Sequence, residues 1–206
     1  MSQNKTNFAV PLAFVGMMFF AIGFALGINS FLIPVLKGAL SLPSGVAYLL
    51  LAATFVPFLI FGYPASATIA KIGYKRTMAL SFLIFAVAFI LFVLSAKLEN
   101  FILFLIASFV SGAANAYLQA SVNPYITILG PIESAAKRMS IMGICNKLAW
   151  PVAPLFFALV VADQTNVQTS DLYLPFYIII GVFLLLGIIS LMAPLPEVKA
   201  AGEDES

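Results

Sequence analysis

Residues 101–130 have the sequence FILFLIASFVSGAANAYLQASVNPYITILG, which is apolar enough for a lipid bilayer but carries a ladder of polar side chains. The members of the ladder are spaced three or four residues apart: Ser108, Ser111, Asn115, Gln119 and Asn123. At about 3.6 residues per turn, this spacing places all of them on one side of a helix. Because an unpaired polar group in hydrocarbon is costly, the ladder is not expected to face lipid.

Two interpretations of this ladder remain open for each residue taken alone. The side chains either line a water-filled cavity, or they join neighbouring helices by hydrogen bonds, as Ser, Asn and Gln often do in membranes. The length of the ladder and its end at Asn123-Pro124 favour the cavity for the set as a whole. The stretch therefore predicts a polar solute pathway in a helical membrane protein.

The composition excludes several classes of protein. The chain has 206 residues, of which 63% are hydrophobic and only 9% are charged, whereas about a quarter of a soluble domain is charged. The sequence contains no histidine and one cysteine, Cys145, which excludes an intrachain disulfide, the usual metal sites and His-dependent catalytic triads. We therefore expect a lipid-embedded protein with no metal, no catalytic residues and no nucleic-acid partner.

Six apolar runs are long enough to cross the hydrocarbon core as helices, which takes about 20 residues each. These runs are residues 8–35, 45–67, 77–96, 101–129, 139–162 and 173–194. They lack the alternation of barrel strands, so the predicted fold class is an all-α membrane protein. The six-helix bundle is expected over residues 8–195, between a short N-terminal segment (1–7) and an acidic tail or linker (196–206).

The basic residues predict the orientation. With the N-terminus inside, seven of them fall in inside segments: Lys5, Lys71, Lys75, Arg76, Lys137, Arg138 and Lys199. Only Lys37 and Lys97 fall in outside segments. Because cytoplasmic loops carry the excess of Lys and Arg, we expect a multi-pass protein of the cytoplasmic (inner) membrane with both termini cytoplasmic.

Small residues and prolines suggest an internal repeat. Gly23, Gly27 and Ser30 share one side of the first span and predict close helix packing there, and Pro34 is expected to end this span. The other prolines inside the runs concentrate in the second, fourth and fifth spans, so the third and sixth are expected to be packing helices. This distribution predicts a 3+3 inverted repeat, which is common in secondary transporters.

Four segments carry a resemblance to a known family. They are GINSFLIP (27–34), FGYP with GYKR (61–64 and 73–76), VNPY with LGPIES (122–125 and 129–134), and Asn146. The chain resembles the N-terminal six-helix half of a major facilitator superfamily transporter. More narrowly, it is similar to the fucose permease and glucose/galactose transporter group of sugar:cation symporters.

The resemblance implies a hexose-type sugar carried by alternating access. It implies no cofactor, coupling to H⁺ or Na⁺, and a missing C-terminal half or a second copy of the chain as partner. Ser30 and Gln119 stand where members of the group carry Asp and Glu, and neither residue can change protonation as a carboxylate does. Candidate substrate-binding residues are Asn29, Ser30, Asn115, Gln119, Asn123, Asn146, Lys147 and Trp150.

Charged and aromatic residues add further candidates. Lys147 is the one charge well inside a predicted span, and its ammonium either lies in the cavity or snorkels toward the inner interface. Trp150 either stacks on a sugar or packs in the core. A candidate cytoplasmic gate comprises Lys75, Arg76, Glu133, Lys137 and Arg138, with solvated surface charge as the alternative.

Two further functions stay open at this point. The same fold could carry another hydroxylated solute, such as a nucleoside or a polyol. The missing carboxylates are also compatible with a non-transporting binding or assembly subunit, or with a truncated fragment. No nucleophile, base and orienting group can be assembled for an enzyme.

Overall fold

The computed structural model describes residues 9–161 and 167–193, and these form helices without any strand. The helices are α1 (Ala9–Ala39), α2 (Ser44–Ala47), α3 (Leu49–Lys97), α4 (Phe101–Ile128), α5 (Ala135–Val160) and α6 (Tyr173–Met192). Two 3₁₀ turns, η1 (Ile132–Ser134) and η2 (Thr169–Leu172), precede α5 and α6. The expected N-terminal segment (1–7) and acidic tail (196–206) lie outside the described residues.

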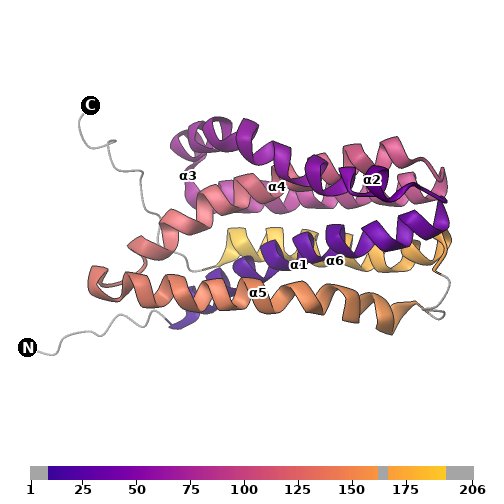
Figure 1. The fold of residues 1–206 in the computed structure, drawn as a ribbon. Helices are drawn as coiled ribbons and strands as arrows, with labels where there is room; N and C mark the ends of the chain where they lie inside the picture. The colour runs from indigo at the N-terminus through magenta and orange to yellow at the C-terminus, as the bar shows by residue number, and fades with distance from the viewer. Residues whose placement is uncertain (1–8, 162–166, 194–206) are drawn as a thin grey trace, which may run out of the picture.

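Five helices of the described residues are long and apolar enough to cross a membrane, where the sequence predicted six. The difference arises in α3, whose two arms meet at Gly73, a residue with non-helical backbone angles (φ 81°, ψ 169°). Figure 1 shows α3 bending back at one end of the molecule. The sequence analysis ended one apolar run at residue 67 and began the next at residue 77, whereas the helix continues through this gap on both sides of Gly73. Glycine alone adopts these angles readily, so one residue is enough to redirect the chain.

The first helix is longer than predicted. α1 continues through Pro34 to Ala39, so the prediction that Pro34 ends the span is wrong. Proline removes one hydrogen-bond donor, but membrane helices tolerate this where packing holds both sides of the helix. Leu32 and Leu36 flank Pro34 and are fully buried, which supplies that packing.

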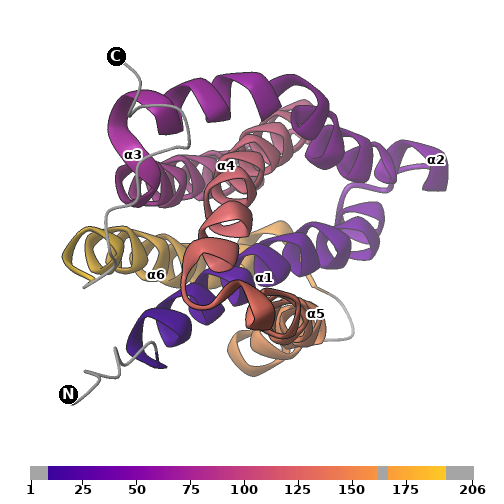
Figure 2. The same cartoon turned by 90° about the vertical axis from the view of Figure 1, so that its left-hand side faces the viewer.

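The long helices run side by side, in a bundle visible in Figures 1 and 2. α3 packs mainly on α4 and α6, whereas α1 packs mainly on α5 and less extensively on α4. Stacked rings join the second arm of α3 to α6. The centroids of Phe85 and Phe183 are 4.7 Å apart, and those of Phe92 and Phe176 are 5.4 Å apart. These contacts agree with the prediction that the third and sixth apolar runs serve packing.

Charged residues gather at the two ends of the bundle. Lys71, Lys75 and Arg76 flank the kink of α3, and Lys137 and Arg138 lie in the first turn of α5. Figure 1 shows the kink and the α4–α5 connection at the end where α1 begins and α6 finishes. Lys37 and Lys97 lie in the last turns of α1 and α3, at the opposite end. The described basic residues thus have the uneven distribution that the sequence predicted.

Candidate substrate site between α1, α4 and α5

Glycine allows α1 and α5 to touch backbone to backbone. A Cβ at Gly23 would lie 1.9 Å from the backbone oxygen of Asn146, and one at Gly27 would lie 2.6 Å from that of Trp150. Any larger residue would push the helices apart, because real Cβ atoms do not approach oxygen this closely. The predicted close packing along Gly23 and Gly27 is confirmed.

Two asparagines bind the same turn of α1 from different helices. Asn146 of α5 donates from Nδ2 to the carbonyl of Phe19 at 3.1 Å. Asn115 of α4 donates from Nδ2 to the carbonyl of Ile22 at 3.4 Å. Because Phe19 and Ile22 are three residues apart, α4 and α5 meet α1 at the same level of the bundle. We call this meeting point, formed by Phe19, Ile22, Asn115 and Asn146, the polar junction.

Further amides extend the polar junction along α1 and α4. Asn29 donates from Nδ2 to the carbonyl of Ala25 at 3.0 Å and to Ser111 Oγ at 3.5 Å. Gln119 donates from Nε2 to Asn115 Oδ1 at 3.3 Å. Buried Oδ1 of Asn29 has no hydrogen-bond partner among the described residues. This oxygen is a hydrogen-bond acceptor held inside the helix interface.

The structure divides the ladder of α4 into two parts. Ser108, Ser111 and Asn115 are buried, so the prediction that the whole ladder lines a cavity is wrong for these three. Ser111 and Asn115 are bonded to α1, in agreement with the helix-joining interpretation, whereas Ser108 Oγ is buried with no hydrogen-bond partner among the described residues. Gln119 and Asn123 are only half-buried. They are the part of the ladder that neighbouring helices leave partly uncovered.

The remaining candidates lie on α1 and α5. Ser30 is half-buried, and its hydroxyl donates to the carbonyl of Leu26 at 3.1 Å. Lys147 is exposed, and its Nζ lies 5.1 Å from the centroid of the Trp150 ring. Trp150 is half-buried against the core, and its buried Nε1 has no hydrogen-bond partner within the described part of the chain.

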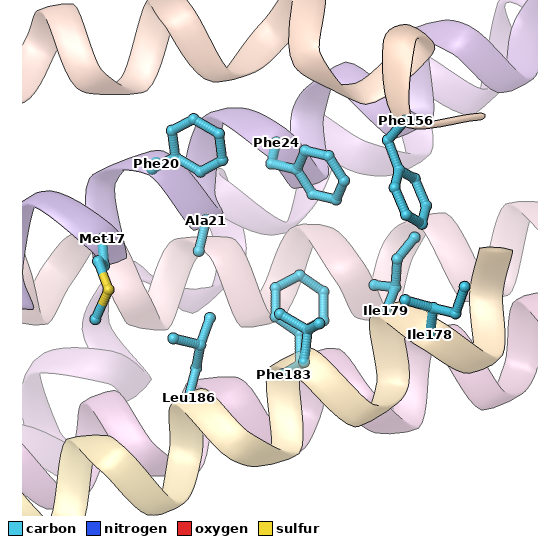
Figure 3. A pocket seen from close by; sticks show the side chains of 10 residues that line it. Met17, Phe20, Ala21, Phe24, Phe156, Ile178, Ile179, Phe183 and Leu186 are labelled. Carbon is cyan, nitrogen blue, oxygen red and sulfur yellow. The ribbon is translucent and has the colours of Figure 1, made fainter. Parts of the chain in front are cut away.

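A separate cavity of about 270 Å³ lies between α1, α5 and α6, lined by residues such as Phe20, Phe24, Phe156 and Phe183. Figure 3 shows these rings converging on it. Its lining offers no amide, hydroxyl or charge, so it cannot satisfy the hydroxyl groups of a sugar. The sequence analysis missed this apolar groove, although Met17, Phe20 and Phe24 follow the spacing of one helix face.

Arg138 has a role that the sequence did not reveal. It is only 7% exposed, and its guanidinium donates to the carbonyls of Ile126 (3.1 Å), Thr127 (3.1 Å) and Pro131 (2.8 Å) and to Ser134 Oγ. The last carbonyls of a helix lack intrahelical donors. Arg138 therefore caps α4 and ties the α4–α5 connection to α5, and it is not a solvated surface charge.

The other candidate gate residues lie near the same end of the bundle. Arg76, Glu133 and Lys137 are exposed, and Lys75 is half-buried. Arg76 also lines a shallow apolar cavity between α3 and α6. Lys75 and Arg76 extend from α3, and Glu133 and Lys137 from η1 and α5, so the set comes from two different connections.

Comparison with known proteins identifies the family. Residues 14–206 match the model of the Major Facilitator Superfamily. The chain belongs to this superfamily. Its members and the relatives described next are transporters and not enzymes.

Two curated relatives are named for sugars. A glucose/galactose transporter of Brucella abortus is 31% identical over 99% of this chain and 50% of its own length. The L-fucose-proton symporter of Escherichia coli is 22% identical over 98% of this chain and 51% of its own length. The chain thus spans about half the length of the curated relatives it matches.

A solved structure shares the fold. The crystal structure of the Major Facilitator Superfamily transporter FucP in the outward conformation superposes with a TM-score of 0.79 at 22% identity. The match covers 97% of this chain and 53% of FucP. The resemblance stated from the sequence is confirmed at the level of family and fold.

Proposed function

We propose that this chain forms one half of a transporter that moves a hexose-type sugar across the cytoplasmic membrane by alternating access. The observation that carries the proposal is a set of half-buried neutral amides at and beside the polar junction, Gln119, Asn123 and Asn146, in an otherwise apolar helical bundle. Amides donate and accept hydrogen bonds, which suits sugar hydroxyls. The relatives named as glucose/galactose and L-fucose transporters support this class of substrate.

Six membrane crossings in a 3+3 inverted repeat are part of the proposal, with the two arms of α3 counted as separate crossings. A pair of matching glycine contacts supports it. A Cβ at Gly23 of α1 would lie 1.9 Å from the backbone oxygen of Asn146 in α5. A Cβ at Gly112 of α4 would lie 2.1 Å from the backbone oxygen of Thr54 in the first arm of α3. The first helix of each repeat thus meets the second helix of the other in the same way.

The proposed substrate contacts are the polar groups that remain partly accessible. Gln119 and Asn123 contribute from α4, Asn146 and Lys147 from α5, and Ser30 from α1. Asn29 and Asn115 hold the helices together beneath them. Trp150 offers an aromatic face beside Lys147, on which the apolar side of a sugar could stack.

A second half is required to close the opposite wall of the pathway. We infer that it is supplied by a C-terminal six-helix half or by a second copy of this chain, since the relatives are about twice as long. Both termini are proposed to be cytoplasmic, on the end that carries Lys71, Lys75, Arg76 and Lys137, following the positive-inside rule.

Coupling to an H⁺ or Na⁺ gradient completes the proposal. The relative named L-fucose-proton symporter supports H⁺. Ser30 and Gln119 cannot carry a proton, so the proton-carrying group would belong to another position or to the second half. The polar contacts of this half then serve sugar binding and not proton transfer.

Uptake of labelled D-glucose, D-galactose and L-fucose into proteoliposomes tests the proposal. The chain alone is compared with the chain joined to a matching C-terminal half, under imposed proton and sodium gradients separately. We expect accumulation by the joined protein, driven by one gradient. Accumulation by the chain alone would identify a working homodimer.

Binding without accumulation, by folded protein in either form, would contradict the transport proposal and favour a binding or assembly subunit. Preference for a nucleoside or a polyol over all three sugars would contradict the substrate class. A Lys37→Gln variant serves as a control, because Lys37 lies in the last turn of α1, away from the polar junction.

A further inference from the structure

Charge is distributed unevenly with depth in this chain. All acidic residues fall in the breaks between apolar runs or in the tail: Glu99, Glu133, Asp163, Asp171, Glu197, Glu203, Asp204 and Glu205. Lys147, in contrast, is the thirteenth of the 26 residues of α5, about 18 Å along the helix from its start. Among the described residues, Glu99, Glu133 and Asp171 all lie between the long helices, so none of these carboxylates is at the depth of Lys147.

The helix geometry determines which way Lys147 points. Phe156, nine residues later on α5, lines the apolar groove shown in Figure 3. Nine residues are two and a half helical turns, so Lys147 leaves α5 on the side opposite the groove. Its neighbour Asn146 binds α1 at the polar junction. Lys147 thus lies on the flank of α5 next to the polar junction and away from the apolar groove.

The space beside Lys147 is open. One turn earlier, a Cβ at Gly143 would meet no atom within 4 Å. One turn later, the Trp150 ring lies 5.1 Å from the ammonium, a distance at which the ring face attracts a cation. The ammonium is therefore exposed, between open space at Gly143 one turn earlier and the Trp150 ring one turn later.

We propose that the substrate is an anionic carbohydrate, a sugar carrying a carboxylate such as a hexuronate, and that Lys147 pairs with this carboxylate. The proposal rests on the proposed sugar transport and specifies its substrate class. An ammonium at this depth needs a counter-charge, and a carboxylate forms a charge-assisted hydrogen bond with it. The half-buried amides of Gln119, Asn123 and Asn146 then take the hydroxyl groups. An acidic residue of the second half is the competing source of counter-charge.

Trp150 provides the readout, because it is the only tryptophan of the chain. The chain is placed in lipid nanodiscs, and its tryptophan fluorescence is titrated at neutral pH with D-galacturonate, D-galactose and acetate. D-galacturonate contains both the sugar and the carboxylate of the proposed ligand. D-galactose contains the sugar alone, and acetate contains the carboxylate alone. We expect half-saturation by D-galacturonate at a concentration about tenfold lower than by D-galactose or acetate.

Three variants separate a specific contact from general effects. Lys147→Gln should reduce the preference for D-galacturonate to within about twofold, because one charge pair is lost. Lys147→Arg should keep most of the preference, which also shows that substitution at this position leaves the fold intact. Lys37→Gln should behave as the unmodified chain, because Lys37 lies in the last turn of α1.

Equal responses to D-galacturonate and D-galactose, or a preference for D-galactose, would overturn the anionic substrate. An unchanged preference in Lys147→Gln would overturn the role of Lys147 and point to a counter-charge elsewhere. Accumulation of neutral hexoses in proteoliposomes, with no effect of D-galacturonate on fluorescence or on uptake, would contradict the anionic substrate. The proposed function would then remain supported. If no probe changed the fluorescence and no sugar were taken up, both the anionic substrate and the proposed transport function would be contradicted.

Discussion

At the scale of single residues, Gly23 shows how one missing side chain sets the distance between two helices. Its Cα lies so close to α5 that an added Cβ would stand 1.9 Å from a backbone oxygen. A backbone atom cannot move aside as a flexible side chain can, so the helices themselves would have to separate.

Gly23→Ala should therefore lower the free energy of unfolding by more than about 2 kcal/mol, through overpacking at the helix crossing. Gly181→Ala on α6 is the matched control, because a Cβ there meets nothing within 4 Å. It should be neutral or stabilising by up to about 1 kcal/mol, since alanine is the better helix former. The SDS mole fraction at the unfolding midpoint measures both. Equal midpoints for the two variants would contradict the backbone contact.

Arg138 acts through several acceptors at once. Arg138→Lys should cost about 3 kcal/mol of unfolding free energy, because a single ammonium cannot reach all the carbonyls that the guanidinium binds. The exposed neighbour Lys137 is the control, and Lys137→Gln should change stability by less than about 0.5 kcal/mol. Cleavage after Glu133 by a glutamate-specific protease, within the α4–α5 connection, should accelerate only in Arg138→Lys. Unchanged stability and cleavage would show that Arg138 does not hold this connection.

The sequence was informative for Gly23 and uninformative for Arg138, for a physical reason. The spacing of Gly23 and Gly27 is a local pattern with one common use in membrane helices, and the structure confirms it. The role of Arg138 depends on where the carbonyls of Ile126 and Pro131 point, which is set by the path of the connection. A basic residue in a predicted loop carries no sign of such partners.

At the scale of whole elements, the polar ladder of α4 changes along its length. Ser108, Ser111 and Asn115 are covered by neighbouring helices, whereas Gln119 and Asn123 are only half-buried. The periodicity of the ladder predicted the common face of these residues. It could not predict where along α4 the cover of neighbouring helices ends, because that depends on how the helices cross.

This division can be measured by comparing two truncations. Asn115→Ala should lower the unfolding free energy by about 1 kcal/mol or more, because it removes the bond to the Ile22 carbonyl and the acceptor of Gln119 Nε2. Gln119→Ala should leave stability nearly unchanged but reduce sugar uptake severalfold. Stability is measured by SDS unfolding and uptake in proteoliposomes. The reverse assignment, with Gln119→Ala the less stable variant, would contradict the division.

Helix α3 shows a different limit of sequence analysis. The apolar run at residues 77–96 lies wholly in the second arm of α3, and the run at residues 45–67 begins in α2 and continues as the first arm of α3. The polar residues between them suggested a loop, yet both arms continue almost to Gly73. A helix can include charged residues such as Lys75 where it leaves the apolar part of the bundle. The polar residues therefore mark the end of the apolar run and not the end of the helix.

At the scale of the whole molecule, the basic residues distinguish the two ends of the bundle. The orientation proposed from them is testable in cells after Cys145→Ser removes the only native cysteine. In this background, a membrane-impermeant maleimide should label Lys97→Cys in intact cells. It should label Arg76→Cys only after the membrane is opened, because cytoplasmic ends carry the positive charge. Both positions are exposed, and labelling of Arg76→Cys in intact cells would contradict the orientation.

The polar junction also has a mechanical consequence for the whole body. Asn115 is the fifteenth of 28 residues in α4, and Asn146 is the twelfth of 26 in α5, so both helices are fastened to α1 near their midpoints. If the helical bundle tilts as a rigid body about the polar junction, residues near the junction move least and residues at the ends of the helices move most. In the proposed alternating-access motion, a tilt about the polar junction would have an amplitude that grows toward the kink at Gly73. A spectroscopic distance probe placed at the kink of α3 should therefore detect the tilt as a change in distance. A probe beside Asn115 should show almost no change.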